Sequence, residues 1–392
     1  MKLAIGAVAS ILILAAGGAG ASSGFPPEAE YSDSSPIVSP DGKRIAFLRT
    51  GIVRGDLVRA DSLYVADANG RHARALTRGS TYSRTNTEVG HYDAVRSVSW
   101  SPDGRRLVYE HVYQGTRYDY SHGELVIVDA DGKNAHVLVA SSTPYEQAES
   151  PSWSAVRNQI VFDESGGLYR IDPDGSDMIA IAHDPDPKYD PAWSPDGSKI
   201  AVAIGGGLAL ITADGSRGPF LGLGKIGAGS PSWSPDGKTI AFNADPDDIN
   251  TDIYTVEPDG SHLRRLTANP APDINPSWTP DGKAIVFASA RGRGYLQYDL
   301  WTMDADGRHE RPLARRPVRH AWNGRRCTIT GTVAADELHG TPQADVLCGR
   351  AGNDFIYARD HRRDVVDGGS GRDRAQIDKG LDVVRGVEKI IP

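Results

Sequence analysis

The chain has 392 residues, a formal net charge of −8, 44 Gly, 25 Pro and 2 Cys. This length exceeds that of an ordinary single domain, and the abundant turn formers indicate many short elements. The negative balance argues against a nucleic-acid partner, which would require a basic face, and we expect none.

The first 21 residues have the pattern of a secretory signal peptide. One charge, Lys2, precedes an apolar run over 3–16, and the segment ends in the small residues Ala19, Gly20 and Ala21. A transmembrane helix is the alternative, but the run is short for one. We therefore predict a secreted or extracytoplasmic protein, with no membrane span in the mature chain.

A four-strand pattern follows and repeats. Its clearest copy, 231–267, has short β-branched or aromatic segments separated by Pro-Asp-Gly and Asp-Gly turns, which is typical of hairpins. The first turn recurs with Gly at positions 42, 104, 197, 237 and 282, with a degenerate copy at 154–157. The second turn recurs with Gly at positions 70, 132, 175, 215, 260 and 307.

A Trp precedes most copies of the first turn, at Trp100, Trp153, Trp193, Trp233 and Trp278. Successive Trp residues are 53, 40, 40 and 45 positions apart, a period typical of propeller blades with four strands each. We predict an all-β fold, a six-bladed β-propeller over 35–313. The Trp is interpreted as a wedge between blades, and the repeated turn Asp as a backbone requirement rather than a ligand.

The repeated string Trp-Ser-Pro-Asp-Gly-Lys, followed by Ile-Ala-Phe, Ile-Tyr and Asp-Gly, resembles the TolB-type, WD-repeat-like propeller repeat. The resemblance covers 35–313 and implies the propeller fold. It implies no single activity, because such repeats occur in protein-binding, polysaccharide-acting and peptidase-associated proteins, and a fold does not transfer function.

Insertions at 51–61 and 112–124, and the segment 81–94, extend the first two blades. Long loops on a rigid scaffold often bind ligands, and Tyr gives a large contact area at low entropic cost. We predict binding of an unknown protein or glycan there, and the alternative is that these polar loops pack on one another. The candidates are Tyr82, His91, Tyr92, Asp93, Tyr113, Tyr118, Asp119, Tyr120 and His122.

The sequence contains no G-x-S-x-G, H-E-x-x-H or phosphate-loop string, which favours a non-catalytic binding protein. One alternative is an extracellular hydrolase or lyase acting on a polysaccharide or lactone, with two channel carboxylates as acid and base. Another is a structural envelope or adhesion component. Candidate acid–base groups are His183, Asp184, Asp186, Asp190, Asp245, Asp247, Asp248 and Asp252.

The repeat pattern of the sequence changes after the propeller. Residues 314–326 are basic and read as a linker, and from residue 327 an Asp recurs about every nine positions. The strings 349–354 and 368–373 resemble the RTX (haemolysin-type) calcium-binding nonapeptide. The resemblance implies a small parallel β-roll over 327–392, in which turn carbonyls and Asp carboxylates bind Ca²⁺.

The positions that match the RTX nonapeptide imply the following calcium ligands: Asp336, Asp345, Asp354, Asp364, Asp373 and Asp382, with Gly352, Gly369 and Gly371 in the turns. The alternative is a degenerate roll without metal. Two turns open with Gly-Thr rather than Gly-Gly, and one turn carries Arg359, His361, Arg362 and Arg363 where small residues are expected.

The two cysteines, Cys327 and Cys348, lie in this segment. In an oxidising compartment they predict one disulfide, which would contribute about 3 kcal/mol by loop closure.

Overall fold

The computed structural model describes residues 30–53, 58–77, 92–114, 121–140, 147–182, 186–221, 223, 226–246, 250–291 and 298–313, and, further on, 321–322, 325–327, 329–330, 336–341, 343–349, 352–359, 361–369 and 371–391. Within these ranges every regular element is a β-strand, and no helix is present that could span a membrane. The predicted signal peptide, 1–21, lies outside the described residues. The chain divides into two compact units, 1–288 with 302–311 and 289–301 with 312–392.

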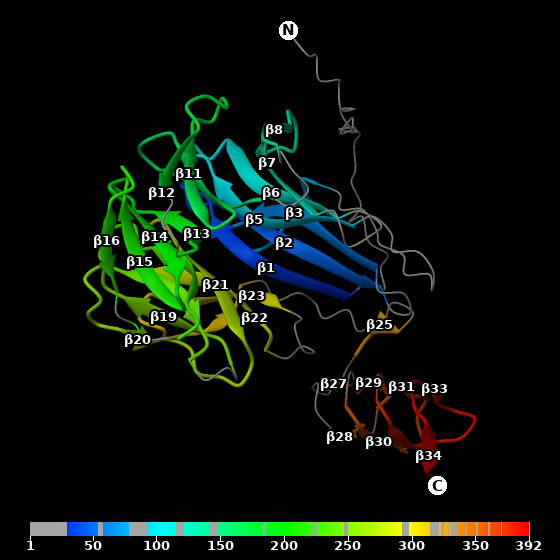
Figure 1. Cartoon of the computed structure of the whole chain (residues 1–392). Helices are drawn as coiled ribbons and strands as arrows, with labels where there is room; N and C mark the ends of the chain where they lie inside the picture. The colour runs from blue at the N-terminus through cyan, green and yellow to red at the C-terminus, as the bar shows by residue number, and fades with distance from the viewer. Residues whose placement is uncertain are drawn as a thin grey trace. The chain divides into compact units, whose positions relative to one another are not determined.

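Six four-stranded sheets form the blades in the described part of the propeller (Figure 1). The first three blades are β1 (Glu30–Val38), β2 (Arg44–Val53), β3 (Val58–Asp67) and β4 (Arg74–Ala75); β5 (Tyr92–Trp100), β6 (Arg106–Gln114), β7 (Ser121–Asp129) and β8 (His136–Val139); and β9 (Ala148–Trp153), β10 (Ile160–Glu164), β11 (Gly167–Ile171) and β12 (Ile179–Ala182). The last three are β13 (Tyr189–Trp193), β14 (Lys199–Ile204), β15 (Gly207–Thr212) and β16 (Arg217–Phe220); β17 (Gly229–Trp233), β18 (Ile240–Ala244), β19 (Asp252–Val256) and β20 (Arg264–Arg265); and β21 (Asp273–Trp278), β22 (Ala284–Ser289), β23 (Asp299–Asp304) and β24 (Arg311–Pro312). The prediction of a six-bladed propeller is confirmed.

The first strand of each blade lies innermost, and these strands contact one another in a closed ring: β1, β5, β9, β13, β17, β21 and again β1. Each blade consists of four consecutive strands. The ring therefore closes by side contact between β21 and β1, without exchange of a strand. At this seam the Val38 amide donates to Ser277 Oγ at 3.3 Å.

The inner strands bend at equivalent positions. Five residues that precede a proline have left-handed backbone there, with φ between 49° and 53°: Ser35, Ser150, Asp190, Ser230 and Asn275. In β1, β9, β13 and β17 the register with the second strand shifts at this point. A left-handed non-glycine residue is strained, and such bulges re-aim side chains. The second blade has Ser97-Val98 at this position instead.

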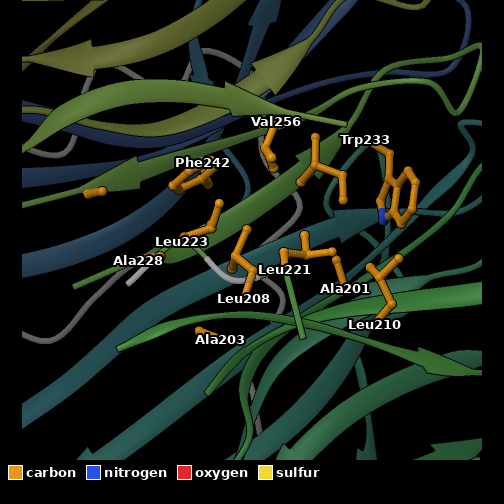
Figure 2. Close-up of a cluster of buried hydrophobic side chains, with 12 residues drawn as sticks. Ala201, Ala203, Leu208, Leu210, Leu221, Leu223, Ala228, Trp233, Phe242 and Val256 are labelled. Carbon is orange, nitrogen blue, oxygen red and sulfur yellow. The ribbon is translucent and has the colours of Figure 1, made fainter. Parts of the chain in front are cut away.

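The repeated Trp side chains pack between blades, as predicted. Trp100, Trp153, Trp193 and Trp233 are 4 to 9% exposed, and each joins an apolar cluster shared with the preceding blade. Trp233 belongs to the same buried cluster of blades 4 and 5 as Leu208, Leu210 and Phe242 (Figure 2).

The first-turn aspartates are structural. Asp236 Oδ1 accepts the Ser234 hydroxyl at 2.7 Å and the Lys238 amide at 3.1 Å, and equivalent bonds recur at Asp41, Asp103, Asp196 and Asp281. The turn thus uses its carboxylate to hold its own backbone.

The insertions of blades 1 and 2 contain more strand than expected. Pairing of β2 with β3 continues to Val53 and Val58, and pairing of β6 with β7 continues to Gln114 and Ser121. The prediction of loops over 51–61 and 112–124 is therefore wrong for most of these residues. β-Branched and aromatic residues in both segments favour strand pairing over loop.

The C-terminal part is a parallel β-roll of two sheets (Figure 1). One sheet holds β27 (Ile329–Thr330), β29 (Val346–Cys348), β31 (Val365–Asp367) and β33 (Val383–Arg385). The other holds β28 (Glu337–His339), β30 (Phe355–Ala358), β32 (Arg374–Ile377) and β34 (Lys389–Ile391). Its core consists of the apolar residues that follow the repeated aspartates, among them Leu338, Leu347, Ile356, Val366 and Ala375.

A short hairpin, β25 (Ala321–Trp322) with β26 (Arg325–Arg326), lies within the segment predicted as a linker. The predicted disulfide is present: Cys327 is joined to Cys348, with their Cα atoms 6.0 Å apart. It ties the residue before the first strand of the roll to β29, whose Cys348 is buried.

Candidate functional site

The repeated aspartates of the roll form two ladders, one along each edge. We call the turns that end at Asp336, Asp354 and Asp373 the first edge, and those that end at Asp345, Asp364 and Asp382 the second edge. Four of the six carboxylates accept the amide of the Asp one coil earlier, at 2.8 to 2.9 Å: Asp354 from Asp336, Asp373 from Asp354, Asp364 from Asp345 and Asp382 from Asp364. One oxygen of each of these acceptors is therefore committed to the fold.

On the first edge, Asp354 and Asp373 each have a second carboxylate oxygen that the ladder does not use. Asp354 and Asp373 are 1% and 0% exposed, and the Oδ2 atom of each has no hydrogen-bond partner among the described residues. Burial raises the pKa of the Asp354 carboxyl to about 6, and the charges of Asp373 and Asp336 add to the effect. Burial likewise raises the pKa of Asp373. A buried carboxylate oxygen without a donor needs a cation or a proton.

Glycines bring further oxygens to the same rim. A Cβ atom on Gly349 would collide with both Asp354 Oδ2 and the Gly368 carbonyl oxygen, so these two oxygens from successive turns converge. Predicted site residues Gly352, Gly369 and Gly371 have φ of 111°, 91° and 147°, and a Cβ on Gly371 would collide with the Gly352 carbonyl. Carboxylate and carbonyl oxygens are the ligands that Ca²⁺ prefers, so the first edge fits calcium.

At two of its three positions, Asp345 and Asp382, the second edge uses carboxylate oxygens internally. Asp345 Oδ2 accepts the Thr341 amide at 2.6 Å and the Thr341 hydroxyl at 2.8 Å, and Asp382 Oδ2 accepts the Asp378 amide at 2.8 Å. Thr341 belongs to one of the turns that open with Gly-Thr. Oδ2 of Asp345 and both oxygens of Asp382 thus serve the fold before any metal binds.

A second group of carboxylates lies at the inner rim of blades 2 to 4, and we call Glu110, Glu149, Asp163 and Asp190 the channel cluster. Asp163 of β10 is the direct cross-strand partner of Glu149 of β9. Glu110 Oε2 accepts the Ser97 hydroxyl at 2.8 Å. Like charges opposite each other on a sheet are destabilising, so this arrangement carries a cost.

Three carboxyls of the channel cluster, Glu110, Glu149 and Asp163, have raised pKa values. Burial raises the pKa of Glu110 to about 7, and the charge of Glu149 adds to it. Burial raises the pKa of Asp163 to about 8, with contributions from Asp190, Glu149 and Glu110. The pKa of Glu149 is also raised by burial, while the Arg96 guanidinium opposes the shift.

Comparison with protein families matches residues 163–320 to the TolB beta propeller domain and residues 328–360 to the RTX calcium-binding nonapeptide repeat. The chain pairs a TolB-type propeller with RTX-type repeats. No curated protein matches the sequence.

Solved structures similar to the chain include TolB from Acinetobacter baumannii, at 17% identity over 71% of this chain and 62% of that one, with a TM-score of 0.49. The tricorn protease is 16% identical over 72% of this chain and 26% of its own, with a TM-score of 0.49. An oligogalacturonate lyase from Vibrio parahaemolyticus is 16% identical over 77% and 83%, with a TM-score of 0.46. The chain thus spans less than two thirds of TolB and about a quarter of the tricorn protease.

Three of the predicted ligand-binding residues of the TolB-type propeller share one row of blade 2. Asp93 of β5 pairs with Tyr113 of β6, which pairs with His122 of β7. Tyr92 lies one position along, opposite Gln114. The remaining candidates, Tyr82, His91, Tyr118, Asp119 and Tyr120, lie outside the described residues.

The predicted acid–base candidates separate in the structure. Asp190 belongs to the channel cluster, whereas Asp252 forms an ion pair with Arg265, and Asp186 pairs with Arg217 at 3.1 Å. Asp245 Oδ1 accepts the Asn250 amide at 3.3 Å. His183, Asp184, Asp247 and Asp248 lie outside the described residues.

Sequence reasoning missed Glu110, Glu149 and Asp163. A comparison between blades could have found two of them. The equivalent position in the second strand of each blade is occupied, in chain order, by Leu48, Glu110, Asp163, Ala203, Asn243 and Ala288. Only two blades place a carboxylate there. A carboxylate that is buried at a position where the other blades have a neutral residue destabilises the fold, so such a position is a candidate functional position.

Proposed function

We propose that this chain is a secreted binding protein, whose propeller is the platform for a partner and whose RTX-type roll is stabilised by Ca²⁺. The observation that carries the proposal is the first edge, where Asp354 Oδ2 and Asp373 Oδ2 are buried, have no hydrogen-bond partner among the described residues, and lie beside glycine carbonyls. A single Ca²⁺ between turns 349–354 and 368–373 would neutralise both carboxylates. Since the unfolded chain has no such arrangement, binding would stabilise the folded roll.

Several features support an extracytoplasmic location. The Cys327–Cys348 disulfide is typical of oxidising compartments, and residues 1–21 have the pattern of a signal peptide. We assign 1–21 to the signal peptide, 35–313 to the propeller, 314–326 to a linker and 327–392 to the roll. The partner is a protein or glycan, and the formal charge of −8 disfavours nucleic acid.

Calorimetric titration of the full-length mature chain with Ca²⁺ tests the proposal. We expect saturable uptake by the native protein, strongly weakened uptake by Asp354→Ala and Asp373→Ala, and nearly native uptake by Asp345→Ala. The last variant is the matched control, because it removes the same group from the second edge. Absence of uptake at millimolar Ca²⁺ would show that the aspartates only hold turns.

One observation favours a second function, an extracellular hydrolase or lyase. In the channel cluster the pKa of Glu110 is about 7 and that of Asp163 about 8, the range in which a carboxyl acts as a general acid at neutral pH. Assays of the native protein and Glu110→Gln on polysaccharides and lactones test it. Turnover that disappears in the variant would replace the binding assignment of the propeller.

A further inference from the structure

The channel cluster is built around one residue of blade 3, Ser150. The Ser150 amide donates to Glu110 Oε2 at 3.4 Å, and its hydroxyl donates to Asp190 Oδ1 at 3.1 Å. A hydrogen bond with Ser150 also lowers the pKa of Asp163. One hydroxyl proton cannot be donated to two carboxylates at once, so Ser150 leaves the cluster short of donors.

Two carboxylate oxygens of the cluster are buried and accept no hydrogen bond from the described residues. Glu110 and Asp163 are each 2% exposed, and Glu110 Oε1 and Asp163 Oδ1 have no hydrogen-bond partner in the described part of the chain. A buried acceptor left without a donor costs free energy and requires an explanation. By contrast, Asp190 Oδ2 is satisfied by the Ser230 amide at 2.9 Å.

The carboxylates of the cluster also repel one another. Arg96 on β5 lowers the pKa of both Glu110 and Glu149, whereas the pKa of Asp163 is set mainly by burial and by the charges of Asp190, Glu149 and Glu110. Glu149, Asp190 and Ser150 are half-buried, so this side of the cluster is partly exposed to solvent. It therefore lacks what a cation with N–H groups would supply.

We propose that the channel cluster binds one ammonium or guanidinium group, the chemistry of a lysine or arginine side chain or of a free amine. Such a group brings positive charge and several N–H donors, which match the open oxygens of Glu110 and Asp163. A bare divalent ion is the competing occupant, and the test below includes it. This inference rests on the proposed role of the propeller as a binding platform, and it does not depend on calcium.

Binding would have a proton signature. Burial raises the pKa of Glu110 to about 7 and that of Asp163 to about 8, so at neutral pH the free cluster retains protons. A bound cation favours the ionised carboxylates, and the displaced protons pass to the buffer. A cation held by ordinary exposed carboxylates would release none.

The test is isothermal titration of the full-length protein, at fixed Ca²⁺, with end-blocked Gly-Lys-Gly and Gly-Arg-Gly, with end-blocked Gly-acetyllysine-Gly, and with putrescine. Two buffers of different ionisation enthalpy report proton release. We expect saturable binding with proton release for the cationic probes and none for the acetylated peptide. Glu110→Gln and Asp163→Asn, which keep the side-chain shape, should each weaken binding at least tenfold. The control Glu257→Gln makes the same chemical change at a distant turn and should bind as the native protein does.

The relative affinities of the peptides and putrescine identify the source of the cation. Unchanged binding in both Glu110→Gln and Asp163→Asn, binding without proton release, or no binding of any amine would overturn the proposal. Saturable uptake of Mg²⁺ that Glu110→Gln abolishes, without amine binding, would overturn it in favour of a metal. Because the probes report on the propeller, these results are separate from calcium uptake by the roll.

Discussion

The first edge of the roll predicts how steeply stability depends on calcium. One Ca²⁺ bound between the turns of Asp354 and Asp373 stabilises the folded roll in proportion to the logarithm of its free concentration. Above the dissociation constant, each tenfold rise adds about 1.4 kcal/mol to the free energy of unfolding. Occupation of both edges would double this slope, because two sites would contribute. We expect the single slope, because Asp345 and Asp382 on the second edge use Oδ2 within the fold.

Asp354→Ala should reduce the slope to near zero, and Asp345→Ala should leave it unchanged. The assay is urea unfolding of the full chain across a series of free Ca²⁺ concentrations, with the roll followed by hydrogen exchange of its strands. The propeller transition serves as an internal control, because its turn aspartates hold their own backbone. A slope that survives Asp354→Ala, or that disappears in Asp345→Ala, would refute the assignment of the first edge.

Three further predictions concern other parts of the chain. Replacing Cys327 and Cys348 by Ser should lower the stability of the roll by about 3 kcal/mol, measured by urea unfolding, and an unchanged midpoint would contradict a stabilising disulfide. The pKa of Asp163 is about 8 in the folded protein against an ordinary value of 3.8, so the folded state binds more protons than the unfolded state between these values. The stability that Asp163 contributes to the propeller should therefore be lost as pH rises from about 4 to 8, by at most about 1.4 kcal/mol per unit, and Glu110 should add to the decline up to its pKa of about 7; Asp163→Asn should make the decline less steep, and identical pH profiles would disprove the burial effect. Mass spectrometry of secreted protein should find an N-terminus near Ser22, and material that retains residues 1–21 would exclude cleavage there.

The propeller was predictable because its signals are local. The first turn of a blade can be recognised from four consecutive residues, because its backbone requires Pro, Asp and Gly. The Trp before this turn recurs about once per blade. For the first edge of the roll, only the repeat of aspartates was predictable from the sequence. Which aspartates have open oxygens depends on whether a neighbour such as Thr341 turns its hydroxyl toward Asp345, and spacing does not report that.

The channel cluster was less accessible to sequence analysis. Glu110 and Glu149 lie 39 positions apart, and only the packing of blade 2 against blade 3 brings them together. Their burial follows from long-range packing of inner strands, whereas a carboxylate in a strand usually indicates a solvated face. The extended hairpins of blades 1 and 2 were misjudged for the same reason: pairing of Val53 with Val58 depends on a partner strand, not on composition alone.

The way the ring closes bears on how the chain folds. Because every blade is made of four consecutive strands, its ladders join residues that are near in sequence, and the loop-closure entropy for each blade is small. A chain that emerges from an export channel in the N-to-C direction can complete each blade as soon as its own strands are outside. Only the seam between β21 and β1 must wait for the last blade. Docking of these two strands is therefore the step of highest contact order in the propeller, and we expect it to come last.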